Sequence, residues 1–135
     1  MVQLDESAWK TYLNQGGFFT VLYPPLWQVS DLLNGKAYGV MFRGSEGEVR
    51  IYWGGGFGGG PCQSGRLDIT TQIGLSNFCD DIVQNGENLS SSNDFVQTGL
   101  TPAGGSSLKV TAAINKPLVS NKAVVVSVIK SIKSF

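Results

Sequence analysis

Six glycines around one phenylalanine, Gly54–Gly60, form the stretch of this sequence where chemistry would first be sought. The spacing Gly54-x-Gly56-x-x-Gly59 matches the fingerprint of dinucleotide-binding turns. In such turns a helix starts directly after the glycines, and its N-terminus holds the pyrophosphate. Here the residues that follow, 61–65 (Pro-Cys-Gln-Ser-Gly), lack the apolar period of a helix, and the last glycine is not followed by the Lys-Ser or Lys-Thr pair of a P-loop. We therefore expect no phosphate site.

The aromatic residues of this stretch offer a second kind of site. Trp53 ends the preceding apolar run, and Phe57 stands between Gly56 and Gly58. Glycines permit backbone paths that other residues do not, so these two aromatic side chains could stand on a loop as a ligand platform. Trp53, Gly56, Phe57 and Gly58 are thus the candidate binding residues. The alternative is an irregular connection with no site.

The two cysteines, Cys62 and Cys79, lie 17 positions apart. We predict a disulfide between them, which would stabilise the fold by roughly 3 kcal/mol in the loop-entropy model; two buried reduced thiols are the alternative. A zinc site would need further good ligands, and a catalytic thiol would need an imidazole, but the chain has no histidine. The same absence removes the Ser-His-Asp triads. We predict no metal, no cofactor and no catalytic residues.

Carboxylates are few, and Asp80-Asp81 is an adjacent pair beside Cys79. Neighbouring residues of a strand point to opposite faces, so this pair does not form a general acid/base dyad. We predict that both are solvated surface acids, while Asp68, Glu87 and Asp94 lie elsewhere. The minor hypothesis, an enzyme that uses Asp80 or Asp81 as a base, requires an elevated carboxylate pKa in a cleft.

The composition indicates one domain, residues 1–135, with a substantial core. Charged residues make up only 15%, and ten basic residues balance ten acidic ones, so no basic face for nucleic acid is expected. No apolar run reaches the roughly 18 residues of a membrane span. Low charge, abundant Ser, Thr, Asn and Gly, and two cysteines suit an extracytoplasmic domain whose leader is absent from this sequence.

Period-2 patterns and turn signals predict strands along most of the chain. Residues 8–53 are expected to form a β-meander, in which a short helix near Trp9 is the competing interpretation. Pro24-Pro25 ends one strand, and Asn34-Gly35 indicates a hairpin. Residues 84–94 are expected to be a polar loop. The predicted strands cover residues 9–14, 18–23, 27–33, 37–43, 48–53, 66–73, 78–83 and 107–115, with a brief pairing near 95–100.

The C-terminus changes to a helical period. Its apolar stripe comprises Val124, Val125, Val128, Ile129, Ile132 and Phe135. Ser120 or Asn121 could cap the start of this helix. We predict an α+β fold, a twisted antiparallel sheet of six to eight strands with the C-terminal helix packed on one face; an all-β sandwich is the alternative. The predicted core comprises Phe19, Val21, Trp27, Val29, Val40, Phe42, Val49, Ile51, Leu67, Ile69, Val110, Val128, Ile129 and Ile132.

The segment Phe18–Val29, with Tyr23-Pro24-x-x-Trp27 inside it, resembles the signature near the start of domains in the PsbP/Mog1-like superfamily, including small bacterial lipoprotein-like relatives. The apolar ending Val128–Phe135 and the glycine-rich stretch before a cysteine are similar too. The resemblance implies an antiparallel sheet flanked by helices, a structural role for Tyr23, Pro24 and Trp27, and binding of proteins rather than conversion of substrates. Photosynthetic members attach to photosystem II, and a eukaryotic relative binds a small GTPase.

This chain departs from those members, because it lacks histidine, is near-neutral and shows few helices before residue 120. Only the architecture and the non-enzymatic role carry over, not the partner. We expect an extracytoplasmic, non-enzymatic domain that binds another protein or envelope component at the cell envelope, without nucleic acid. The alternative is a small-ligand or glycan-binding module that uses the aromatics of the glycine-rich segment.

Overall fold

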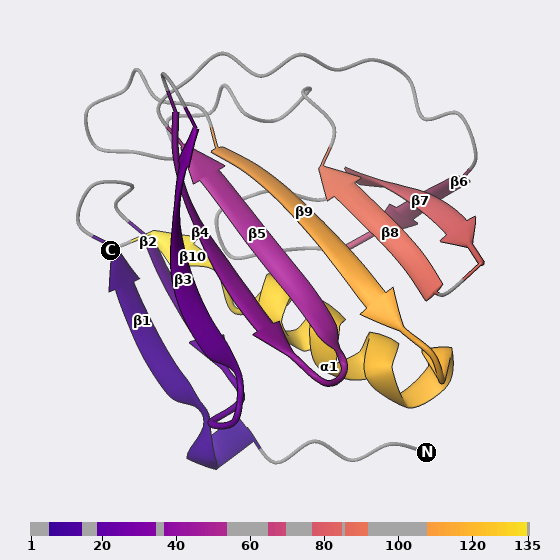
Figure 1. Cartoon of the computed structure of the whole chain (residues 1–135), viewed down its shortest axis with the longest axis horizontal. Helices are drawn as coiled ribbons and strands as arrows, with labels where there is room; N and C mark the ends of the chain where they lie inside the picture. Colours follow the sequence, from indigo (N-terminus) through magenta and orange to yellow (C-terminus); the bar gives the residue numbers. More distant parts are fainter. Residues whose placement is uncertain are drawn as a thin grey trace.

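In the computed structural model, the described residues form two antiparallel sheets and one α-helix (Figure 1). The structure describes residues 6–14, 19–34, 37–53, 65–69, 77–84, 86–91 and 108–134. The smaller sheet has the order β1-β2-β10, formed by Lys10–Asn14, Phe19–Tyr23 and Lys133–Ser134. A single 3-10 turn, Glu6–Ala8, precedes β1. The strand predicted near Trp9 is therefore confirmed.

The larger sheet has seven strands in the order β3-β4-β5-β9-β8-β7-β6, and every neighbouring pair is antiparallel. Figure 1 shows β9 between β5 and β8. On either side of β9 the strands follow one another in sequence order, as β3-β4-β5 and as β6-β7-β8. The strands are β3 (Gln28–Asn34), β4 (Ala37–Gly44), β5 (Gly47–Trp53), β6 (Gly65–Asp68), β7 (Asn77–Val83), β8 (Gly86–Ser91) and β9 (Leu108–Asn115).

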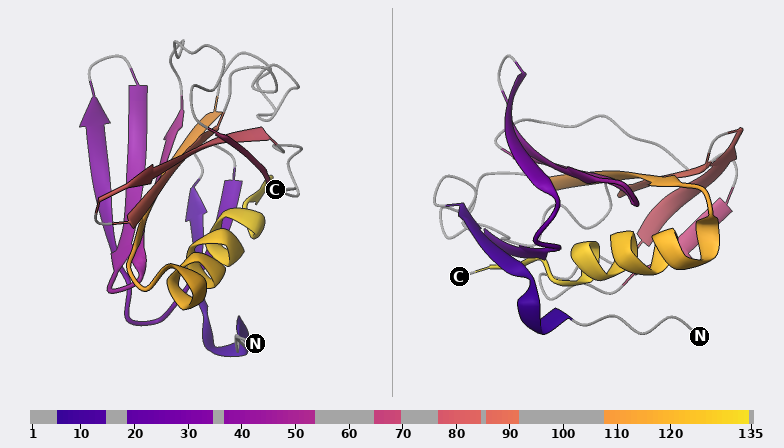
Figure 2. Two further views of the ribbon diagram at one scale, coloured as in Figure 1. Left: turned by 90° about the vertical axis from the view of Figure 1, so that its right-hand side faces the viewer. Right: turned by 60° about the horizontal axis from the view of Figure 1, so that its bottom comes forward.

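The helix α1 (Leu118–Lys130) and the smaller sheet lie on the same side of the seven-stranded sheet (Figure 2). We call this side of the larger sheet the inner face. The buried side chains of α1 are Val125, Val128 and Ile129, which belong to the predicted stripe. Ser131 fastens the end of the helix to β2, because its Oγ accepts a hydrogen bond from the backbone N–H of Leu22 at 2.9 Å. The α+β prediction is confirmed, and the helix excludes the all-β sandwich.

The predicted core is largely confirmed, because alternation along the strands and the helical stripe both point to one interior. Val29 and Leu67 are partly buried, and the other twelve predicted residues are fully buried. The core also contains Phe78, Leu89, Ala112, Ile114 and Val125, which the core prediction omitted. Four of these additional residues lie on β7 and β8, or on β9 where it pairs with β8.

The prediction of one continuous meander over residues 8–53 is wrong, because β2 and β3 belong to different sheets. The chain turns between them at Pro24–Leu26, where the backbone N–H of Trp27 donates to the carbonyl of Pro24 at 3.0 Å. A proline cannot donate to a strand ladder, so the Pro24-Pro25 pair ends the pairing and allows the change of sheet.

Trp27 anchors this corner in the interior. It is only 4% exposed, and its Nε1 donates a hydrogen bond to Glu46 Oε1 at 2.9 Å. The indole lies directly over Gly44, where an added Cβ would stand 2.0 Å from a ring atom. Tyr23 packs beside Phe42 with ring centroids 5.3 Å apart. Tyr23 and Trp27 therefore occupy structural positions, in agreement with what the Tyr-Pro-x-x-Trp pattern implied.

Two local predictions need correction. Residues 86–91 form strand β8, not a polar loop. The helix starts at Leu118, with Pro117 at the N-cap position and no side-chain cap, so neither Ser120 nor Asn121 caps it. Proline suits the start of a helix, because the backbone N–H that it lacks would have no partner within the helix there. The side chain of Asn121 does not cap the helix, and its Nδ2 donates to the carbonyl of Asn115 at 3.1 Å. Over the described part of the chain, no helix combines the length and apolar character of a membrane span.

Candidate functional site

A groove crosses the face of the seven-stranded sheet opposite α1, which we call the outer face. It has a volume of about 400 Å³ and lies over the three neighbouring strands β5, β9 and β8. We call it the outer groove. Ligand sites in proteins commonly have volumes of about 300–1,000 Å³, so its size is that of a binding site. Its lining comprises Glu48, Arg50, Tyr52, Asn88, Leu89, Ser90, Thr111, Ala112 and Ala113.

The alternation of each strand makes this face polar. On β5, Val49 and Ile51 are buried on the inner face, so the residues between and beside them point outward. On β9, Val110, Ala112 and Ile114 are buried in the same way. A strand therefore supplies the core with one set of side chains and the outer groove with the other.

The register of the strands explains why the outer face is hollow here. Thr111 of β9 pairs with Arg50 on one side and with Ser90 on the other. Ala113 pairs likewise with Glu48 and with Asn88. The side chains of Thr111 and Ala113 are short, while the outward side chains of β5 are long. Because directly paired residues stand side by side on one face, Thr111 and Ala113 of β9 form the floor, the long side chains of β5 form one wall, and Asn88 and Ser90 of β8 line the other side.

The charges in the β5 wall neutralise each other. Arg50 Nε donates to Glu48 Oε2 at 2.6 Å. Hydrogen bonds to Tyr52 and to Glu48 raise the pKa of the Arg50 guanidinium above its ordinary value. The wall therefore presents a row of hydrogen-bonding groups without an excess of either charge.

The ring of Tyr52 has a fixed place at the end of this row. It lies against the bare backbone of Gly39 on β4, where an added Cβ would stand 2.9 Å from Cδ1 of the ring. Tyr52 is half-buried. Glycine at position 39 thus lets the aromatic ring settle on the sheet surface, next to the outer groove.

The binding residues predicted from the sequence are not tested by the structure. Trp53 is the last residue of β5, but its side chain lies outside the described residues, as do Gly56, Phe57 and Gly58. The outer groove was not predicted. Its residues come from three separate segments of the sequence, and only the pairing of β9 with both β5 and β8 brings them together.

Cys79 lies on β7, opposite Ser90 of β8, and is half-buried. Cys62 is outside the described residues, so the disulfide stays a prediction. We expect intact protein, denatured without reductant and treated with an alkylating reagent, to gain no alkyl groups, and a peptide map to link the segments that contain Cys62 and Cys79. A reduced sample, which should gain two alkyl groups, is the control. Alkylation of both thiols in the unreduced sample would contradict the disulfide and weaken the extracytoplasmic assignment.

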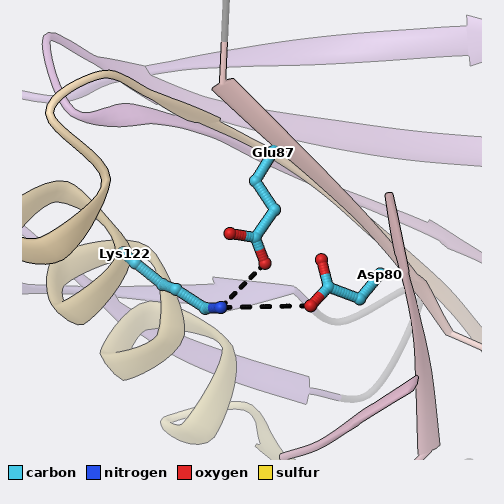
Figure 3. Close-up of polar contacts among 3 residues, drawn as sticks. All are labelled: Asp80, Glu87 and Lys122. Atoms are coloured by element: carbon cyan, nitrogen blue, oxygen red, sulfur yellow. Dashed lines mark hydrogen bonds and ion pairs between the residues drawn. The ribbon is translucent and has the colours of Figure 1, made fainter. Parts of the chain in front are cut away.

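A second polar cluster lies on the inner face, between β7, β8 and α1 (Figure 3). Lys122 of α1 places its Nζ 2.8 Å from Glu87 Oε2 and 4.0 Å from Asp80 Oδ2. Glu87 is only 2% exposed, while the side chains of Asp80 and Lys122 are 19% and 32% exposed. Asp80 Oδ1 is buried and accepts no hydrogen bond from any of the described residues. We call these three residues the ionic cluster.

The two carboxyl groups of the ionic cluster differ in proton affinity. Burial, together with a hydrogen bond and charge repulsion from Glu87, raises the pKa of Asp80 to about 6, although Lys122 opposes the shift. Burial acts to raise the pKa of Glu87 as well, but hydrogen bonds from Asp80 and Lys122 outweigh it and lower that pKa. Near pH 5 the pair therefore shares one proton, held by Asp80, and Lys122 balances the charge of Glu87.

The ionic cluster corrects the prediction for the acidic residues. Asp81 is exposed, as predicted, but Asp80 is a half-buried member of the cluster, and Glu87 is buried rather than in a loop. The Asn85-Gly86 dipeptide is a hairpin signal that could have placed Glu87 on a strand. Asp80 faces away from the outer groove, so it does not reach a ligand there. Over the described residues, no three His, Cys, Asp or Glu side chains form a group that could hold a metal ion.

Comparisons with known proteins add little to this description. No protein-family model matches the chain, and no curated protein matches its sequence significantly. A crystal structure from Bacteroides thetaiotaomicron is similar, with a TM-score of 0.44 and 11% identity over 93% of this chain and 48% of that one. The chain thus spans about half the length of that protein. A likeness this weak carries no information about function.

Proposed function

We propose that this protein is a non-enzymatic, extracytoplasmic domain that binds a component of the cell envelope in the outer groove. The observation that carries the proposal is the groove itself, a hollow of about 400 Å³ over the middle of the sheet. Helix α1 and the smaller sheet lie on the inner side of the seven-stranded sheet (Figure 2), so the outer groove is on the opposite face.

The side chains of the outer groove favour binding over catalysis. Its carboxylate, Glu48, is held in an ion pair by Arg50 and so is poorly placed to take a proton from a substrate. Asn88, Ser90 and Thr111 offer hydrogen bonds, but the groove lining contains no base beside a nucleophile. The carboxyl group with an elevated pKa, Asp80, belongs to the other side of the sheet.

The resemblance to the PsbP/Mog1-like superfamily agrees with this proposal. The structural positions of Tyr23 and Trp27 match the role that the resemblance implies, and it also implies binding rather than catalysis. The partners of those relatives are not carried over. A site on Trp53 and Phe57 stays a separate prediction.

A steric block of the outer groove tests the proposal. We expect the wild-type protein to sediment with cell envelopes from the organism that encodes it, and Thr111→Phe to lose this association by filling the floor. Ser30→Phe places the same side chain on the same face but on β3, outside the groove, and should still sediment. Circular dichroism would establish that both variants are folded. Equal sedimentation of the two variants, or no sedimentation of the wild type, would overturn the proposal.

A further inference from the structure

We propose that the outer groove binds an uncharged saccharide chain, with a sugar ring stacked on Tyr52. This inference rests on the proposed function and names the chemistry of its ligand. It follows from three properties of the groove, which are its neutral charge, its mixture of donors and acceptors, and its flat aromatic ring.

The charge of the groove disfavours ionic ligands. Among its lining residues the charged side chains are Arg50 and Glu48, and these already satisfy each other at 2.6 Å. Lys109 pairs with Tyr52 on the same face, but it is not among the lining residues. An anionic ligand would have to compete with Glu48 for the guanidinium, and a cationic one with Arg50 for the carboxylate. A neutral polar ligand can hydrogen-bond to both members without breaking the pair, because each keeps further donor or acceptor positions.

The position of the groove disfavours a peptide that would pair as an added strand. Such peptides bind at a sheet edge, where backbone groups are unpaired. The outer groove lies over β5, β9 and β8, in the interior of the sheet, where backbone groups already pair across both sides of β9. A ligand here is recognised by side chains alone.

The polar side chains match the needs of sugar hydroxyl groups. A hydroxyl both donates and accepts, and Asn88, Ser90 and Thr111 can each do the same. In the opposite wall a donor, Arg50, stands beside an acceptor, Glu48, which suits two adjacent hydroxyls of one ring. The short floor of β9 leaves room for the ligand between these walls.

Tyr52 supplies the apolar contact that a sugar ring requires. One face of its ring is supported by Gly39, and its hydroxyl is engaged by Arg50, so the ring is held before a ligand arrives. A rigid aromatic surface costs little entropy on binding. The C–H face of a sugar can then stack on it, while the hydroxyls reach the polar walls.

The experiment is isothermal titration calorimetry with cello-, malto-, manno- and chito-oligosaccharides as probes. At least one of these neutral probes should bind the wild-type protein, and a carboxylated oligosaccharide, titrated as the charged comparison, should bind more weakly. Tyr52→Ala should weaken that binding by about tenfold or more, as truncation of a central aromatic contact typically does. Tyr52→Phe keeps the ring and should retain most of the affinity, Asn88→Ala should weaken it less than Tyr52→Ala does, and Ser30→Ala, outside the groove, should have no effect.

The outcomes separate this inference from the proposed function. Envelope binding that Thr111→Phe abolishes, without affinity for any neutral saccharide, would leave the groove as the site and overturn the saccharide. Preference for a carboxylated oligosaccharide over the neutral ones would also overturn it. Saccharide binding that survives both Tyr52→Ala and Thr111→Phe would mean that the ligand binds elsewhere, which overturns the assignment to this groove.

Discussion

Replacing Lys122 with methionine is expected to lower the free energy of unfolding by about 3 kcal/mol at pH 7, because the substitution leaves a buried carboxylate without its cation. Glu87 is 2% exposed, and Lys122 Nζ at 2.8 Å is the positive charge that compensates it. Methionine keeps much of the length and the apolar stem of lysine. The decrease in the free energy of unfolding therefore measures the effect of the lost charge rather than of lost packing.

The magnitude lies at the lower end of the range for broken buried ion pairs, because the lysine side chain is about one-third exposed. Water can then reach part of the space that the ammonium group leaves, and it screens the remaining carboxylate. Glu87 also loses the hydrogen bond and the charge that lower its pKa, so its pKa should rise in the variant. As a result, the variant should regain stability when the pH falls and Glu87 takes up a proton.

Urea denaturation at pH 7 and at pH 5 would measure both effects. Lys130→Met is the matched control, since Lys130 lies in the last turn of the same helix and is exposed. The control should change the free energy of unfolding by less than about 0.5 kcal/mol, as surface substitutions usually do. Equal losses in the two variants would show that the ionic cluster contributes no more than an ordinary surface charge.

The alternation of apolar residues was enough to predict most of the strands and the core. It worked because β5, β9 and α1 each bury one face, as Ile51, Val110 and Val128 illustrate. Local signals also placed the corner at Pro24-Pro25. These features depend on neighbours along the chain, which a sequence displays directly.

The candidate site depends instead on pairing between distant segments. Thr111 contributes a floor to the outer groove only because β9 inserts between β5 and β8, and no local pattern specifies that insertion. The burial of Glu87 has the same origin. A glutamate in a polar stretch looks solvated, until α1 brings Lys122 from 35 residues away to within 2.8 Å of it. The short side chains of Thr111 and Ala113 on β9 form a hollow only because the long side chains of β5 stand beside them.

Replacing Asp80 with asparagine is expected to raise the free energy of unfolding by about 2 kcal/mol at pH 7.5. This effect is opposite in sign to that of Lys122→Met. The pKa of Asp80 is about 6 in the folded protein, above the value of 3.8 for an unperturbed aspartate. The folded state therefore holds a proton that the unfolded state has lost. For this group, stability is highest below pH 4 and declines as the pH rises through about 6.

At pH 7.5 the wild-type cluster carries two carboxylates against one lysine. One of the oxygens, Asp80 Oδ1, is buried and has no hydrogen bond to a described residue. Asparagine has the shape of the protonated acid and can donate to Glu87 as that acid does, without adding charge. The gain is smaller than the full linkage value of about 3 kcal/mol, because solvent near the partly exposed Lys122 screens the repulsion.

The measurement is the free energy of unfolding from pH 4.5 to 8 for the wild type, Asp80→Asn and Asp81→Asn. The wild type should lose stability between pH 5 and 7, and Asp80→Asn should lack this decline. Asp81 is exposed on the neighbouring position of β7, so Asp81→Asn should follow the wild-type profile. Both variants keep Glu87, whose pKa is lowered in the folded protein. Protonation of Glu87 therefore lowers stability only at the acidic end of the profile, and this decline should be common to all three proteins. A wild-type profile that rises from pH 5 to 7 would mean that Lys122 outweighs burial at Asp80, and that the folded protein prefers both carboxylates charged.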